Sequence, residues 1–101
     1  MIEEHDLRAV VRVFGEKGLE VLNDGLKAQE KAFKLTKERS AKAWETVEWE
    51  VRMAGGVEKV PVYNEAKEQK EELDRVLDEK LRGVEEVRRV LTKVEVERIT
   101  G

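Results

Sequence analysis

The 101-residue sequence contains no cysteine, one proline, one histidine and few aromatic side chains, which make up 5% of its residues. Without cysteine the chain can form no disulfide bond, thiolate nucleophile or cysteine-ligated zinc site. A single histidine, His5, excludes paired-histidine zinc sites and the repeated Glu-x-x-His motif of di-iron bundles. The sequence also does not support a Ser-His-Asp catalytic triad, because Ser40 is the only serine and no histidine stands at a suitable spacing. We therefore predict no catalytic residue and no cofactor, and favour a non-enzymatic protein.

Long apolar runs are also absent, since the longest extend over only a few residues and are too short to span a membrane. The chain begins Met1-Ile2-Glu3-Glu4 rather than with a basic region and an apolar run. We therefore expect no signal peptide and a cytoplasmic location. The formal net charge is −3, so no overall basic field draws the protein toward nucleic acid or an anionic membrane.

Charges of both signs are abundant. Charged residues make up 43% of the chain, compared with about 25% in ordinary globular proteins. Hydrophobic residues still make up 40% and recur with helical periodicity, which argues against disorder. Abundant Glu, Lys and Arg with scarce Asn and Gln are typical of proteins stabilised by surface ion pairs at high temperature. We expect a thermostable protein, similar in composition to small proteins of hyperthermophilic archaea, including proteins of their plasmids and viruses.

The last third of the chain carries the strongest pattern. Between residues 64 and 99, apolar residues follow one another at steps of three or four: Leu73, Leu77, Leu81, Val84, Val87, Leu91 and Val94. This spacing places them on one stripe of a long helix over 64–99. Asn64 is the expected N-cap, because its side chain can accept a hydrogen bond from a backbone N–H of the first turn.

Two more helices are predicted upstream, over 3–14 and 19–53. Gly15 and Gly18 favour a turn between them, because each glycine costs a helix interior about 1 kcal/mol relative to alanine. The alternative is one unbroken helix in which these glycines allow a neighbour to approach closely. Residues 54–63 contain the pair Gly55-Gly56 and Pro61, so we expect a turn and an extended linker there.

The helix over 19–53 has a less regular apolar face. Its inward residues are predicted to be Leu22, Leu26, Phe33, Trp44, Val47 and Val51. Small residues are expected to fill the spaces between them, namely Ala28, Ala32, Ala43 and Ala54.

Together these segments predict an all-α protein with one domain over 1–101. A short N-terminal helix precedes two long helices in an antiparallel, coiled-coil-like hairpin. Such a hairpin leaves each apolar stripe half covered, so we expect self-association into a helical bundle, most simply as a homodimer. The expected interface comprises the stripe above, a second line formed by Val76, Gly83 and Val90, and Trp49 with Met53. This favours a structural or protein-interaction module, a scaffold or adaptor.

A basic stretch offers an alternative function. Residues 27–42 carry six positive charges and two negative ones. The basic residues are Lys27, Lys31, Lys34, Lys37, Arg39 and Lys42. A face of this kind can contact the phosphates of nucleic acid without reading its sequence, and such binding weakens as salt increases. The alternative is therefore sequence-independent nucleic-acid binding.

Four acids suggest a second alternative. Glu45-x-x-Glu48 followed by Glu71-x-x-Asp74 resembles the acidic signature of the all-α nucleoside triphosphate pyrophosphatases of the MazG type. The resemblance implies that these carboxylates, on facing helices, hold magnesium against a triphosphate so that water can attack. The sequence departs from that family around the second pair, where Leu73 precedes Asp74 and Arg75 follows it.

Overall fold

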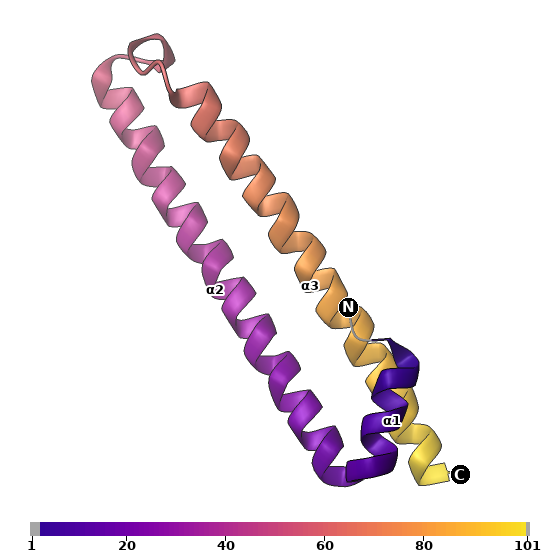
Figure 1. Ribbon diagram of the computed structural model, residues 1–101. Coiled ribbons are helices and arrows are strands. Elements are labelled where there is room, and N and C mark those ends of the chain that lie inside the picture. The colour runs from indigo at the N-terminus through magenta and orange to yellow at the C-terminus, as the bar shows by residue number, and fades with distance from the viewer. Residues whose placement is uncertain (1–2, 101) are drawn as a thin grey trace. The chain divides into compact units, whose positions relative to one another are not determined.

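The computed structural model describes residues 3–100, in which it contains helices and no strand. The elements are α1 (Glu4–Phe14), α2 (Glu16–Ala54), the short 3-10 helix η1 (Val57–Lys59) and α3 (Tyr63–Thr100) (Figure 1). The predicted all-α fold, with a short helix before a hairpin of two long ones, is confirmed. Residues 1, 2 and 101 of the predicted domain lie outside the described residues. None of the described helices combines the length and the apolar character that crossing a bilayer requires.

Contacts divide the chain into two compact units. Unit 1 runs to Ala32 and resumes at Lys80, so it contains α1, the start of α2 and the end of α3. Unit 2 covers Phe33–Glu79 and contains the end of α2, the connection through η1 and the start of α3. Within each unit the α2 and α3 segments run antiparallel (Figure 1).

All three helices contribute to the core of unit 1. Its buried side chains are Leu7 and Val11 from α1, Leu19 and Leu26 from α2, and Val84, Leu91 and Val94 from α3. Leu7 and Leu91 are each only 1% exposed. Because a fully buried leucine contributes about 1.5–3 kcal/mol, α1 is an integral part of this core.

Unit 2 has a thinner core. Within the described residues it buries Val51 and Leu77. Trp44, which is half-buried, packs against Tyr63, with 5.5 Å between ring centroids and 34° between ring planes. Every predicted inward residue of α2, in both units, is buried or half-buried.

The predicted alanine fillers, in contrast, are wrong. The side chains of Ala28, Ala32, Ala43 and Ala54 are all exposed. At 100° per residue these four positions lie on the flank or the far side of α2, away from the row that contains Leu26, Phe33 and Val51. Their small size therefore does not serve the core.

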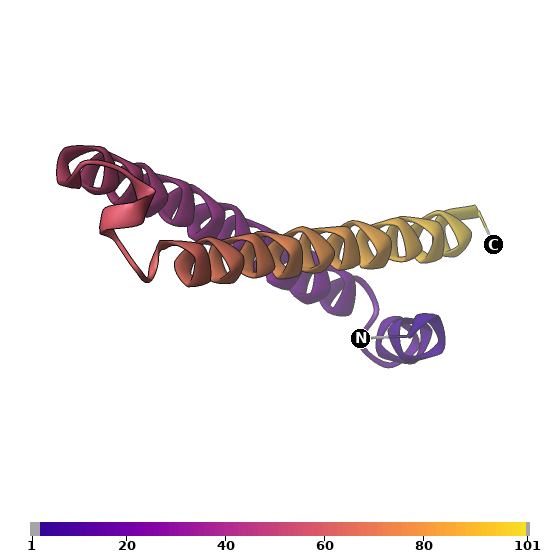
Figure 2. The ribbon, with the colours of Figure 1, turned by 90° about the horizontal axis from the view of Figure 1, so that it is seen from above.

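The break between α1 and α2 is shorter than predicted. Gly15 alone interrupts the helix, with φ +63° and ψ −140°, and α2 begins at Glu16 instead of residue 19. Gly18 is helical and buried against α1, since a Cβ there would lie 3.1 Å from Phe14 Cβ and 3.2 Å from the Val10 carbonyl oxygen. One glycine makes the turn and the other permits close helix approach. Figure 2 shows α1 almost along its axis, set off from α2 by this turn.

We expect Gly15→Ala to lower the free energy of unfolding by about 1–3 kcal/mol, because an L side chain is strained at this positive φ. Urea denaturation measures the loss. Gly83→Ala is the control, because nothing lies within 4 Å of a Cβ built at this helical glycine. That variant should be about 0.5–1 kcal/mol more stable than the wild type. Unchanged stability in Gly15→Ala would show that the turn does not depend on glycine.

The connection between α2 and α3 differs from the predicted extended linker. Gly55 and Gly56 end α2 as expected, with positive φ and a hydrogen bond from the Gly56 N–H to the Val51 carbonyl at 3.0 Å. Residues 57–59, however, form the 3-10 helix η1 rather than part of an extended linker. The Tyr63 N–H then donates to the Val60 carbonyl, so α3 begins one residue earlier than predicted.

The predicted N-cap at Asn64 is therefore wrong. Because α3 begins at Tyr63, Asn64 lies inside its first turn. The carbonyl of Val62 accepts the hydrogen bond that opens the helix, from the Ala66 N–H at 3.0 Å.

Candidate interaction surfaces

The predicted interface stripe of α3 is covered largely by the chain itself. Leu77, Val84, Leu91 and Val94 are between 1% and 5% exposed, and Leu81 and Val87 are half-buried. Only Leu73, at 41%, is exposed. The short N-terminal helix was expected to cover at most one end of the hairpin, and in unit 1 its Leu7 and Val11 enter the core. The buried residues of the stripe are therefore closed to a partner, whereas Leu73 is accessible.

Other predicted interface residues remain accessible. Val76, Gly83 and Val90 are each half-buried on α3, and the space around Gly83 is open. In unit 2, Trp49 and Met53 are 57% and 68% exposed. Their use by a partner remains a prediction.

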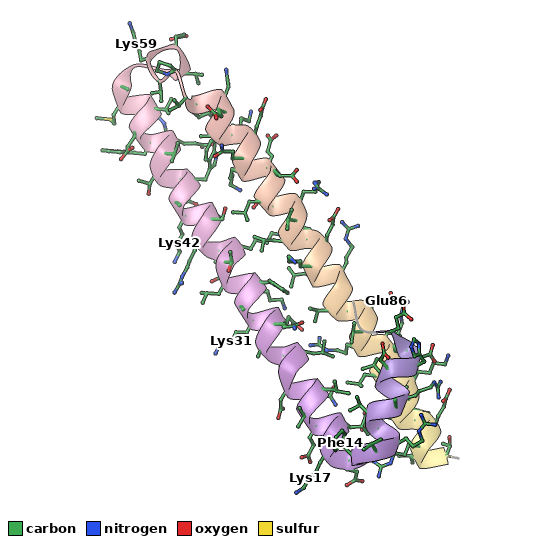
Figure 3. All side chains as sticks on the ribbon, in the orientation of Figure 1. Phe14, Lys17, Lys31, Lys42, Lys59 and Glu86 are labelled. Atoms are coloured by element: carbon green, nitrogen blue, oxygen red, sulfur yellow. The ribbon has the colours of Figure 1, made fainter. Side chains whose placement is uncertain are left out.

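An exposed apolar cluster in unit 1 was not predicted from the sequence. Val13, Phe14 and Val21 are 71%, 65% and 70% exposed around the turn between α1 and α2. A groove of about 260 Å³ opens there, lined by Val10, Phe14, Lys17, Gly18, Val21 and Leu22. Figure 3 shows Phe14 and Lys17 at this corner. No helical spacing in the sequence links Phe14 to Val21, because the helix is interrupted at Gly15 between them.

The basic residues of 27–42 are all exposed, and some are neutralised. Lys37 pairs with Asp78 at 2.5 Å, and this hydrogen bond raises the pKa of Lys37. The acidic Glu30 of the same stretch pairs with Arg88 at 2.5 Å, and Lys34 also has an interacting neighbour.

Four other basic groups keep their charge uncompensated. Within residues 3–100, Lys27, Lys31, Arg39 and Lys42 form no ion pair. Lys31 and Lys42 point away from α3 in Figure 3. The predicted excess of positive charge on α2 is thus reduced by internal pairing without being removed.

The four acids of the pyrophosphatase signature do not assemble into a metal site. In the described part of the chain, no group of three or more carboxylate or imidazole side chains is arranged to hold a metal ion. Glu48 instead accepts a hydrogen bond from Trp44 Nε1 at 2.7 Å, and Asp74 pairs with Lys70. Glu45 and Glu71 are exposed. The geometry gives this resemblance no support.

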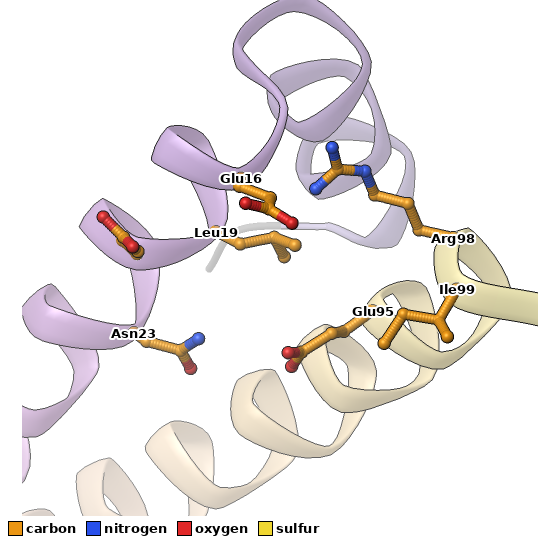
Figure 4. Close-up of a pocket in the computed structure, with 7 residues that line it drawn as sticks. Glu16, Leu19, Asn23, Glu95, Arg98 and Ile99 are labelled. Carbon is orange, nitrogen blue, oxygen red and sulfur yellow. The ribbon is translucent and has the colours of Figure 1, made fainter.

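A second groove in unit 1, of about 380 Å³, lies between the start of α2 and the end of α3 (Figure 4). Its lining consists of Glu16, Leu19, Glu20, Asn23, Glu95, Arg98 and Ile99. Asn23 and Glu95 face each other across it (Figure 4). The four charged side chains are exposed. No polar side-chain atom of residues 3–100 lies buried without a hydrogen bond. The charged side chains that line this groove are therefore in contact with water.

An ion-pair cluster attaches α1 to the end of α3. Arg8 Nη1 lies 2.5 Å from Glu97 Oε2, and Arg8 Nη2 lies 2.8 Å from Glu4 Oε1. Lys93 Nζ is 3.4 Å from the same oxygen of Glu4. The hydrogen bonds from Arg8 lower the pKa of both carboxyl groups, and Lys93 lowers the pKa of Glu4 further.

These pKa shifts predict a loss of stability in acid. Carboxylates whose pKa is below the ordinary 4.5 when folded stabilise the fold above that pH. The contribution is lost as the pH falls through the lowered values. We expect the thermal midpoint of the wild type to fall more steeply below pH 4.5 than that of Arg8→Gln. This variant lacks the guanidinium group that pairs with both Glu4 and Glu97. Parallel pH profiles for the two proteins would contradict this assignment.

No protein-family model matches the chain, and neither a curated protein nor a solved structure matches it. Function is therefore inferred from the surfaces described above.

Proposed function

We propose that this protein is a non-enzymatic helical interaction module that self-associates as a homodimer and acts as a scaffold or adaptor. The observation that carries the proposal is the exposure of Val13, Phe14 and Val21 outside a core that the chain already closes. Clustered apolar side chains on an otherwise charged surface are typical of protein interaction sites. Trp49 and Met53 give unit 2 a further apolar surface suited to a protein partner.

Light scattering of the full chain over a range of micromolar concentrations tests this proposal. We expect twice the monomer mass of 11.7 kDa. The dimer should persist at high salt, because apolar contacts are not screened. A mass of 11.7 kDa at every concentration would overturn the proposal.

We also propose that the protein is heat-stable and of hyperthermophile type. Support comes from the ion-pair cluster of Arg8 and from a second cluster in which Arg75 pairs with Glu72 and Glu79. Such networks stabilise a fold more at high temperature, because the desolvation of charges then costs less free energy. We expect a thermal midpoint above about 65 °C, the upper end of the usual range for mesophile domains. Calorimetry measures this midpoint, and a value within that range would contradict the proposal.

A second candidate function is sequence-independent nucleic-acid binding. The observation that favours it is the uncompensated charge of Lys27, Lys31, Arg39 and Lys42. Fluorescence anisotropy with a labelled DNA duplex at low and high salt tests it. Binding should be salt-sensitive and lost when Lys27, Lys31 and Lys42 are replaced with Glu. The matched control replaces Lys59, Lys67 and Lys80 and should still bind. Absence of binding at low salt would remove this candidate.

A further inference from the structure

We propose that two copies of this chain pair through antiparallel α2 segments, with the two-fold axis between Gly25 and Leu26. This inference rests on the proposed self-association and specifies its surface and orientation. It concerns residues 14–32, all within unit 1.

The surface is a seam on α2 formed by Gly18, Val21, Gly25, Ala28 and Ala32. These residues follow one another at steps of three and four, so they share one side of the helix. Val21 is 70% exposed, Ala28 and Ala32 are exposed, and the space above Gly25 is open. The groove that Val10 and Phe14 help to line continues this apolar surface toward α1.

Within a single chain, one end of this seam is already in contact with a helix. Gly18 lies so close to α1 that a Cβ there would be only 3.1 Å from Phe14 Cβ. Past α1 the seam continues through Val21, Gly25 and Ala28, which are all exposed. A second helix can therefore approach Gly25 and Ala28 as closely as α1 approaches Gly18. It would also contact the apolar side chain of Val21.

The charges beside the seam select a second copy in antiparallel orientation as the occupant. Glu20 and Asp24 precede the proposed axis, and Lys27 and Lys31 follow it. In an antiparallel pair centred between residues 25 and 26, residue i faces residue 51 − i of the other chain. Glu20 then faces the partner's Lys31, and Asp24 faces the partner's Lys27.

All four of these side chains are available for such pairing. Within residues 3–100, none of Glu20, Asp24, Lys27 and Lys31 forms an ion pair. A parallel pair would instead place each of these charges opposite its own copy, and like charges repel. The antiparallel register thus satisfies charges that the single chain leaves uncompensated.

Charge exchange tests this register. Glu20→Lys or Lys31→Glu alone should raise the dimer dissociation constant about tenfold, because each reversal turns two attractive contacts per dimer into repulsive ones. The double variant Glu20→Lys with Lys31→Glu should restore the wild-type value. Glu45→Lys is the matched control on the same helix. In this register no α2 residue of the other chain lies opposite Glu45, so the variant should leave the dimer dissociation constant unchanged. A double variant that is weaker than either single variant would overturn the register.

Single cysteines test the orientation without ambiguity, because the chain has no other cysteine. Gly25→Cys should form an intermolecular disulfide on mild oxidation, since its copy lies beside the axis. Ala32→Cys should not, because the two copies would stand about 20 Å apart along the helices, beyond the Cα separation of about 7 Å that a disulfide tolerates. Crosslinking of Ala32→Cys would indicate a parallel pair and overturn the inference.

The outcomes separate the two proposals. A wild-type chain that is monomeric at all concentrations overturns the proposed function and this inference together. A wild-type dimer in which Gly25→Cys does not crosslink overturns only the inference, since the chains then pair through a different surface. Circular dichroism of each variant confirms that the helices are retained.

Discussion

Leu91→Ala is expected to lower the free energy of unfolding by about 2–5 kcal/mol. Leu91 is 1% exposed at the centre of a core to which α1, α2 and α3 all contribute. The removed methyl groups leave a cavity that helices fixed on three sides cannot close fully. Urea denaturation followed by circular dichroism measures the loss.

Leu73→Ala provides the matched control. Leu73 belongs to the same stripe of α3 but is 41% exposed. Its replacement should cost clearly less than that of Leu91, because 41% of its surface stays exposed in the folded chain. Equal losses in the two variants would contradict the assignment of Leu91 to a closed core.

The second large effect is expected at Leu7, whose replacement with alanine should release α1. Leu7 is 1% exposed, and with Val11 it supplies the buried contacts of a helix only 11 residues long. A helix of this length is marginal in water without tertiary contacts. We expect the free energy that holds α1 against the rest of unit 1 to fall by about 2–5 kcal/mol.

Hydrogen exchange measured by mass spectrometry localises this effect. Peptides covering 4–14 should lose protection in Leu7→Ala, while peptides from the middle of α2 and α3 keep theirs. Val13→Ala, at a side chain 71% exposed on the same helix, should leave protection unchanged. Full protection of 4–14 in Leu7→Ala would show that other contacts hold α1.

The helices were predictable because each depends on local periodicity. The steps of three and four from Leu73 to Val94 specify one face of α3 without reference to any other element. Details that depend on a single backbone angle were not predictable. The φ of +63° at Gly15 turns the chain within one residue, and this turn sends α1 back against Gly18. Sequence periodicity contains no information on that direction.

The charged surface was only partly predictable for a related reason. The sequence identifies a basic stretch but not the register of α2 against α3, and register decides which charges meet. The pairs Lys37–Asp78 and Glu30–Arg88 depend on that register. The exposed cluster at Phe14 and Val21 escaped prediction because it spans two helices. Neither residue stands out until the turn at Gly15 brings them to one corner.

The single-residue link at Gly15 also determines how α1 behaves once its contacts break. A helix held by so short a tether stays close to its binding surface, at an effective concentration in the millimolar range or above. Re-docking is therefore intramolecular and independent of protein concentration. A free peptide with the sequence of α1 would have to reach comparable concentrations to compete for the surface against Leu19 and Leu91.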